Sequence, residues 1–210
     1  TILAPLVAKC KANGVKIHVS VGGANHSGTF ASVVSIPSRR TTFVNSAAAL
    51  ILKYKLDGIN IDWEFPAAQY ATDLASLMTE LKAKLDELEV ILGKELELSA
   101  AVAPLVWNSD GVNSDFIAAC DFILLMAFDS GGNCCVCDNT NHSSYLIAER
   151  AMKKWTTGLA SSCGGSSAGK NTPASKIVLT IPFYAKNGGY SGYNTKSNYV
   201  EIYNDEDGVV

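Results

Sequence analysis

Three polar side chains recur at every second position between Leu56 and Pro66: Asn60, Asp62 and Glu64. Successive side chains of a β-strand point to opposite faces, so a strand here would place these three on one face. Carboxyl groups that lie close together disfavour each other's ionisation and can keep a proton near neutral pH. The pattern therefore predicts a proton-donating site, with Glu64 as the acid at the carboxyl end of the strand.

Two other roles fit the carboxyl groups between Leu56 and Pro66. Carboxylates at strand ends also bind magnesium, but no histidine or further carboxylate in the sequence is arranged to complete a metal site with Asp62 and Glu64. Asp57 stands just before Gly58 and is expected to accept hydrogen bonds from backbone donors. Proton transfer at Asp62 and Glu64 is the interpretation that we favour, with no metal ion.

At these residues the chain resembles the family 18 glycoside hydrolases, the chitinases and their relatives. The family signature D-x-x-D-x-D-x-E is matched by Asp57, Asn60, Asp62 and Glu64, with an amide at the second acidic position. Two further stretches match in the expected order. They are Ser20-Val21-Gly22-Gly23, which resembles S-x-G-G on the third strand, and Met126-Ala127-Phe128-Asp129, which resembles M-x-Y-D on the sixth.

The resemblance implies retaining hydrolysis of β-1,4-N-acetylglucosaminide bonds in chitin or chito-oligosaccharides, without a cofactor. Glu64 would be the general acid/base, and Asp62 would orient the 2-acetamido group of the substrate, whose carbonyl oxygen is the nucleophile. Asp57 and Asn60 would complete the catalytic motif. The substrate would be bound by residues of the second motif, Met126, Phe128 and Asp129, although Phe128 lacks the tyrosine hydroxyl that is usual in the family.

Aromatic residues in loops are candidates for stacking on sugar rings. Trp107 and Tyr184 are the best placed, and Phe30 is a weaker candidate. By strand alternation Trp63 points away from the acidic face, which indicates a packing role. Trp155 lies in an apolar helical pattern and is expected in the core.

A carbohydrate-binding lectin on the same fold is the alternative function. Lectin members of the family usually lose the catalytic glutamate, so the presence of Glu64 favours the enzyme. A third possibility, an inhibitor or partner-binding protein on this scaffold, has no positive sign in the sequence.

The composition is that of an ordinary globular domain: 48% of the 210 residues are hydrophobic and 18% are charged. The net charge of −3 and the absence of a long basic run argue against binding to nucleic acid or to an anionic membrane. No apolar run approaches the ~20 residues that span a bilayer.

A secreted monomer is expected, in which the four loop cysteines, Cys134, Cys135, Cys137 and Cys163, could form two disulfides. Asn25-His26-Ser27 and Asn141-His142-Ser143 match the glycosylation acceptor pattern.

Strand and helix patterns alternate along the chain, which favours a parallel α/β sheet. We expect strands at 15–21, 57–65, 97–102, 122–128 and 177–182, and helices at 1–13, 38–54, 69–92 and 148–157. The resemblance implies a TIM (β/α)₈ barrel, which needs ~250 residues. Only sixteen residues precede Ile17. We therefore expect residues 1–210 to be one incomplete catalytic barrel that lacks the first two strands and the last strand.

Overall fold

The computed structural model describes residues 3–104, 109–129, 142–159, 167–187 and 195–198. The chain forms two compact units. The first comprises Thr1–Val102, Trp107–Leu124 and Ser175–Ile177, and the second comprises Ala103–Val106, Leu125–Ala174 and Val178–Val210.

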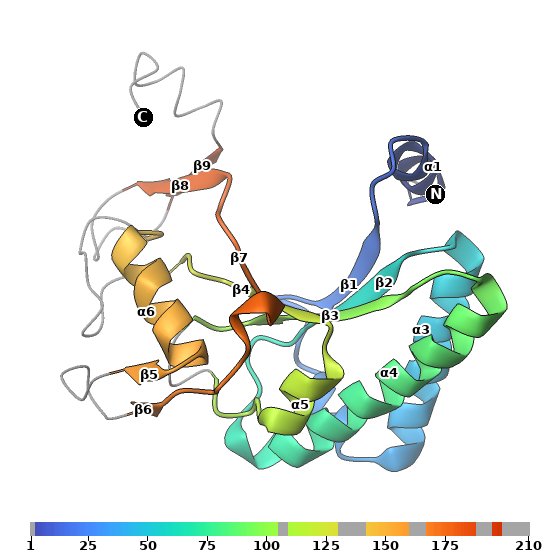
Figure 1. Ribbon diagram of the computed structural model, residues 1–210, viewed down its shortest axis with the longest axis horizontal. Coiled ribbons are helices and arrows are strands. Elements are labelled where there is room, and N and C mark those ends of the chain that lie inside the picture. The colour runs from blue at the N-terminus through green and yellow to red at the C-terminus, as the bar shows by residue number, and fades with distance from the viewer. Residues whose placement is uncertain (1–2, 105–108, 130–141, 160–166, 188–194, 199–210) are drawn as a thin grey trace. The chain divides into compact units, whose positions relative to one another are not determined.

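A parallel sheet organises the first unit. Its five strands have the order β1-β2-β3-β4-β7 (Figure 1), so each of these strands lies beside the next one along the chain. They are β1 (His18–Gly22), β2 (Gly58–Asp62), β3 (Glu97–Val102), β4 (Phe122–Leu125) and β7 (Ile177–Leu179). The pairings of β1 with β2 and of β2 with β3 are parallel, while β4 and β7 begin in this unit and end in the second. Sequential parallel neighbours are the strand order of a β/α barrel.

The helices of the first unit begin and end at residues suited to those positions. They are α1 (Leu3–Ala12), α2 (Phe30–Val34), α3 (Pro37–Tyr54), α4 (Ala71–Leu92), preceded by a 3₁₀ turn at Ala68–Tyr70, and α5 (Ser114–Ala119). Proline opens α3, and Gly93 ends α4 with a φ of 64°. Figure 1 shows α3, α4 and α5 on the same side of β1 to β3. The sequence predicted α1, α3 and α4, but not α2 and α5, whose five and six residues are too short to show a helical period.

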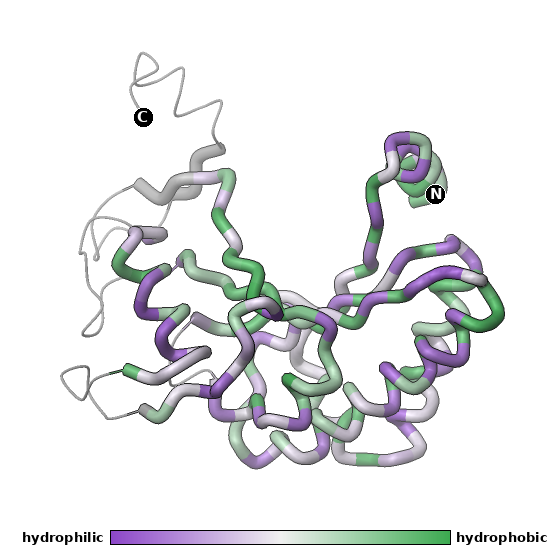
Figure 2. The backbone as a smooth tube through the Cα atoms, viewed as in Figure 1, coloured by the Kyte–Doolittle hydropathy of each residue, from purple (hydrophilic) through white to green (hydrophobic). Residues whose placement is uncertain are grey.

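The core of this unit is formed by apolar side chains of the strands and of α4. Ile59 and Ile61 of β2 are 0% and 1% exposed. The predicted apolar stripe of α4 is buried, and its members are Leu74, Leu77, Met78, Leu81, Leu85 and Leu88. Figure 2 shows hydrophilic and hydrophobic residues alternating along α3 and α4, as expected of helices with one buried face.

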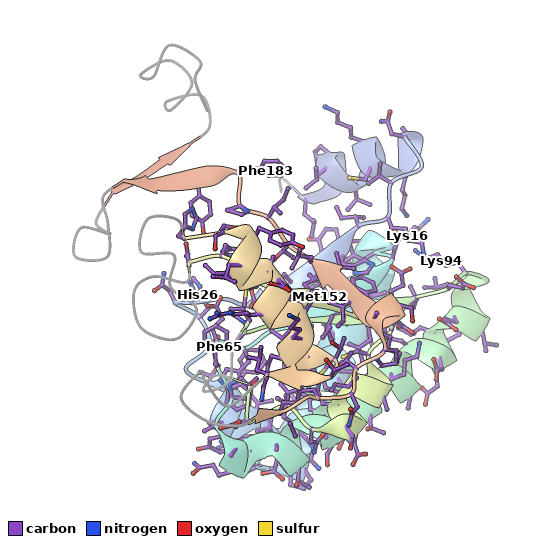
Figure 3. The ribbon with its side chains drawn as sticks, turned by 60° about the vertical axis from the view of Figure 1, so that its left-hand side comes forward. Lys16, His26, Phe65, Lys94, Met152 and Phe183 are labelled. Atoms are coloured by element: carbon purple, nitrogen blue, oxygen red, sulfur yellow. The ribbon has the colours of Figure 1, made fainter. Side chains whose placement is uncertain are left out.

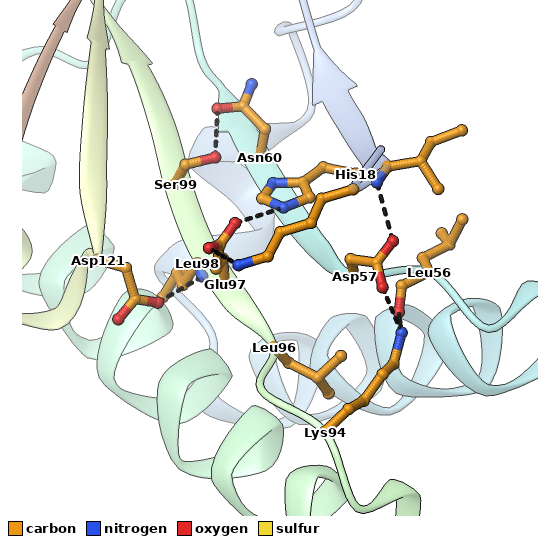
Figure 4. A network of polar contacts seen from close by, with 12 residues as sticks. His18, Leu56, Asp57, Asn60, Lys94, Leu96, Glu97, Leu98, Ser99 and Asp121 are labelled. Atoms are coloured by element: carbon orange, nitrogen blue, oxygen red, sulfur yellow. Dashed lines mark hydrogen bonds and ion pairs between the residues drawn. The ribbon is translucent and has the colours of Figure 1, made fainter. Parts of the chain in front are cut away.

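A polar network joins the strands of this sheet where they begin (Figure 4). Asp57 accepts hydrogen bonds from the Ile17 backbone N–H at 2.9 Å and from Lys94 Nζ at 2.6 Å. His18 Nε2 lies 3.0 Å from a carboxylate oxygen of Glu97. The predicted structural role of Asp57 therefore agrees with its contacts, and these contacts lie at the opposite end of β2 from Asp62.

The close approach of His18 and Glu97 explains why a glycine stands at position 58. A Cβ atom there would overlap the carbonyl oxygen of Glu97 and lie 2.8 Å from His18 Nε2. Only a residue without a side chain allows His18 and β3 to approach β2 this closely.

We expect Asp57→Asn to lower the free energy of unfolding of the complete protein by about 1–2 kcal/mol at pH 7. Burial alone would raise the pKa of Asp57, but the Lys94 ammonium and the Ile17 N–H outweigh it and hold the pKa below the ordinary value of 3.8. The contribution is therefore present above pH 3.8 and is lost as the pH falls through the lower pKa of the folded state. Urea unfolding at neutral and at strongly acidic pH measures this, with the exposed Asp86→Asn as control. An equal difference at both pH values would contradict the assignment.

The second unit contains α6 (Tyr145–Trp155) and short antiparallel pairs. As predicted, Trp155 is in the core. It is fully buried, and its indole N–H donates to the carbonyl oxygen of Ala103 at 2.9 Å. Two hairpins were not predicted, β5 (Gly158–Leu159) with β6 (Ser167–Ala168), and β8 (Tyr184–Asn187) with β9 (Thr195–Asn198). Their strands are short and mostly polar, so their sequences lack the apolar runs that indicate strands.

Candidate active site

The side chain of Asn60 lies in a hydrogen-bonded row that crosses three strands. Its amide nitrogen donates to Ser20 Oγ of β1 at 2.8 Å, and its amide oxygen accepts from Ser99 Oγ of β3 at 3.2 Å. The strand register places Ser20 and Ser99 directly beside Asn60. An amide offers both a donor and an acceptor, so Asn60 satisfies both neighbouring hydroxyls at a position that is only 6% exposed.

The glycine pair of the first motif is packed against the end of β2. Gly22 lies opposite Asp62 in the register and has a φ of 117°, and Gly23 has a φ of 95°. The backbone N–H of Gly23 donates to the carbonyl oxygen of Asp62 at 2.7 Å. The two glycines thus allow the backbone at the end of β1 to pack directly against Asp62.

Asp62 is the last residue of β2, and one oxygen of its carboxyl group is left without a partner in the described part of the chain. Its Oδ1 atom is buried and has no hydrogen-bond partner among the described residues. Burial raises the pKa of Asp62 above its ordinary value. A buried acceptor without a partner is costly, and such atoms are candidates for direct contact with a ligand.

Glu64 follows two residues beyond the end of β2 and is partly buried. Its backbone N–H donates to Ser27 Oγ at 3.0 Å. Because β2 ends at Asp62, strand alternation does not extend to Glu64, and the prediction that one strand face carries all three polar side chains holds only for Asn60 and Asp62. Figure 3 shows His26 and Phe65, which neighbour Ser27 and Glu64 in sequence, at the opposite end of this unit from Lys16 and Lys94.

The aromatic residues near this end of β2 pack against one another. Trp63 is 8% exposed and its ring stacks on that of Phe30, with centroids 5.3 Å apart and an interplanar angle of 13°. Tyr70 packs on Trp63 at 5.5 Å. The packing role predicted for Trp63 is confirmed. The expectation that Phe30 could stack on a sugar is wrong, because Phe30 is 4% exposed and its ring contacts Trp63.

The second unit holds a group of polar and aromatic residues around the second motif. Met126 and Phe128 follow β4, and the Tyr184 hydroxyl donates to Asp129 Oδ1 at 2.7 Å. The Tyr184 ring packs edge-on against Phe128 at 6.2 Å. The structure therefore brings together Phe128, Asp129 and Tyr184, three residues that the sequence proposed for substrate binding.

His142 is a member of this group that the sequence did not reveal. It is 7% exposed, its Nδ1 accepts the Asp129 backbone N–H at 3.2 Å, and its ring stacks on Tyr184 at 5.4 Å. The Nδ1 atom also lies 3.4 Å from Asp129 Oδ1. Its position among polar loop residues gave no signal beyond the glycosylation acceptor pattern around it.

Several predicted features lie outside the described residues. They are the sugar-stacking candidate Trp107 and the loop cysteines Cys134, Cys135, Cys137 and Cys163. Within the described part of the chain, no group of three histidine, cysteine or carboxylate side chains is arranged to hold a metal ion. In the same residues no helix is long and apolar enough to cross a membrane.

The model of the glycosyl hydrolases family 18 matches residues 4–210. The chain belongs to this family. A family 18 relative, Endochitinase 1 of Metarhizium robertsii, is 30% identical over 184 residues, which cover 84% of this chain and 42% of the relative. Chitotriosidase-1 of Mus musculus is 32% identical over 197 residues, covering 85% of this chain and 40% of the relative. The chain therefore spans about two fifths of the length of these relatives.

Solved structures show the same fold. A chitinase-like agglutinin from Robinia pseudoacacia superimposes with a TM-score of 0.75 at 22% identity, over 94% of this chain and 63% of the agglutinin. The predicted fold class, a TIM (β/α)₈ barrel that is incomplete in this chain, is confirmed. Which strands of a whole family 18 barrel lie outside residues 1–210 stays a prediction.

Proposed function

We propose that the complete protein hydrolyses β-1,4-N-acetylglucosaminide bonds in chitin or chito-oligosaccharides with retention of configuration. The observation that carries this proposal is the carboxyl group of Asp62 at the end of β2, two residues before Glu64. Asp62 presents a buried carboxyl oxygen that no described residue satisfies. Membership of family 18 supports the same chemistry, since glycosidic cleavage needs a carboxylic acid beside the leaving oxygen.

In this mechanism Glu64 donates a proton to the glycosidic oxygen as the bond to the sugar carbon breaks. The carbonyl oxygen of the substrate's own 2-acetamido group attacks that carbon and forms an oxazolinium ion. Asp62 accepts a hydrogen bond from the acetamido N–H, which orients the group and stabilises the positive charge. Glu64, now ionised, takes a proton from the water that opens the intermediate.

The acetamido group is therefore a reactant, which gives the proposal its test. The complete protein should cleave N-acetylglucosamine hexamers and leave the fully deacetylated hexamers intact. Proton NMR of the first product should show the β-anomer. Cleavage of both hexamers at similar rates, or an α-anomer as first product, would contradict substrate assistance.

Asn60 stands at the second acidic position of the family signature. Its hydrogen bonds with Ser20 and Ser99 keep the row intact, but an amide cannot take up charge beside Asp62. We propose that this substitution slows turnover and shifts the acid limb of the pH–rate profile.

We therefore expect Asn60→Asp to increase turnover and to move the acid limb to higher pH by about one unit, because a second carboxylate disfavours ionisation of Asp62. The measurement is kcat as a function of pH, with Asn45→Asp on the exposed face of α3 as a control of equal charge. An unchanged profile would count against the role assigned to Asn60.

The second motif is proposed to bind the sugar through Asp129 and Tyr184, together with Met126, Phe128 and the sequence candidate Trp107. Phe128 lacks a hydroxyl for the acetamido carbonyl, and one missing hydrogen bond to a reacting group costs up to ~10²-fold in rate. Activity below that of family members with tyrosine at this position is therefore part of the proposal.

A chitin-binding lectin is the second candidate. The agglutinin whose fold matches this chain supports it, as do Asn60 and Phe128 at motif positions. Binding of chito-oligosaccharides without cleavage, and unchanged binding on Glu64→Gln, would favour the lectin. In either case we propose a secreted monomer that acts outside the cell on chitin or its oligosaccharides, in which the loop cysteines form disulfides.

A further inference from the structure

The loop that joins β1 to α2 contains a buried serine, Ser27, that contacts the backbone where β1 and β2 end. Ser27 is 7% exposed, while Asn25, His26 and Gly28 around it are exposed. Its hydroxyl group lies 2.8 Å from the carbonyl oxygen of Gly23 and 3.2 Å from that of Asp62. It also accepts the backbone N–H of Glu64 at 3.0 Å.

The hydroxyl group of Ser27 acts both as a donor and as an acceptor in these contacts. Its single proton is donated to the carbonyl of Gly23 or of Asp62, and its oxygen accepts the N–H of Glu64. Gly23 is itself bonded to Asp62 through its backbone N–H at 2.7 Å. Ser27 therefore connects the backbone of Glu64, two residues beyond β2, to Gly23 at the end of β1.

Glu64 needs such an attachment because it lies beyond the sheet. The ladder between β1 and β2 ends at the pair Gly22 and Asp62, so strand pairing fixes Asp62 but not the residue two positions later. The direction in which the Glu64 side chain leaves the backbone depends on the turn between Asp62 and Glu64. The Ser27 hydroxyl contacts the carbonyl oxygen of Asp62 and the N–H of Glu64 in that turn.

We propose that Ser27 is a positioning residue, which sets the placement of the Glu64 carboxyl group relative to Asp62 through the Glu64 backbone. This inference rests on the proposed function of Glu64 as the acid. A small misplacement of a reacting group can cost ~10²-fold in rate without preventing substrate binding. Loss of the hydroxyl therefore affects the chemical step more than the affinity for the sugar.

The test compares Ser27→Ala, Ser27→Val and Ser27→Thr in the complete protein. Valine and threonine have nearly the same size, so this pair separates the hydroxyl from the volume of the side chain. Ser32→Ala in α2 is the control, because the Ser32 hydroxyl is exposed and bonds only within its own segment, to the carbonyl of Thr29. Asn25→Gln is added because alanine and valine at position 27, unlike threonine, also remove the glycosylation acceptor pattern.

For each variant, kcat and KM are measured with chito-oligosaccharides alongside the melting temperature. We expect kcat to fall about ten- to hundredfold in the alanine and valine variants, with KM changed less than about threefold. Threonine should restore most of kcat, and Ser32→Ala and Asn25→Gln should leave it unchanged.

Two results would overturn the inference. One is a kcat within twofold of the unmodified protein in Ser27→Ala. The other is a loss that follows the melting temperature and is as large for threonine as for valine, which would mean that Ser27 only stabilises the fold. If the unmodified protein itself cleaves no chito-oligosaccharide, the proposed function fails, and the role of Ser27 fails with it. If the unmodified protein is active and Ser27→Ala is equally active, only the role of Ser27 fails.

Discussion

Glu64→Gln should lower kcat of the complete protein by about 10²- to 10⁴-fold while leaving the affinity for chito-oligosaccharides within a few fold. Glutamine has the shape of glutamate but carries no acidic proton, so the leaving oxygen would depart as an unprotonated alkoxide. The backbone hydrogen bond from residue 64 to Ser27 does not involve the side chain, and the backbone placement should therefore persist.

The measurement is hydrolysis of chito-oligosaccharides together with their binding by calorimetry. Glu87→Gln on the exposed face of α4 is the matched control, since the Glu87 side chain is 63% exposed and, among the residues that the structure describes, pairs with Lys84 of the same helix. A Glu64→Gln protein that keeps more than a tenth of the original kcat would exclude Glu64 as the acid.

Gly22→Ala should reduce the free energy of unfolding by about 3 kcal/mol or more, or prevent folding. The φ of 117° at this position is one that side-chain-bearing residues rarely adopt. A Cβ atom would also overlap the carbonyl oxygen of Asp62 and lie 2.8 Å from the Phe30 ring. Either the end of β1 or the stacked rings of Phe30 and Trp63 would have to move.

Gly28→Ala in the same loop is the control for this prediction. Nothing lies within 4 Å of a Cβ atom at Gly28, and its φ is not in the left-handed region. Thermal and urea unfolding of the two variants should therefore differ clearly. Equal stabilities would show that the backbone of β1 and Asp62 are not packed as described.

The sequence predicted the strands of the parallel sheet and the long helices because each carries an apolar run or a clear local period. The apolar stripe of α4 repeats over twenty-two residues, and β2 alternates apolar and polar residues up to Asp62. The short helices α2 and α5 and the polar hairpins carry no such period. Phe30 was misassigned for this reason: the sequence places it in a loop, but it is the first residue of α2 and its ring stacks on that of Trp63.

The site was predictable in its motif residues but not in the partners that hold them. Ser99 and Ser20 flank Asn60 only because of the register between three strands, and one sequence does not encode register locally. Ser27 and His142 are short polar residues in loops, and their roles arise from burial against segments distant in sequence. Glu64 was placed on the strand by extrapolating an alternation that stops at Asp62.

The most direct test of Glu64 as the catalytic acid is release of fluorophore from 4-methylumbelliferyl N,N′-diacetylchitobioside by the complete protein, with Glu64→Gln as the background. We expect steady release by the unmodified protein and none above background by the variant. No release from either, with chitin binding retained by both, would contradict it and show that this family 18 chain belongs to a binding protein.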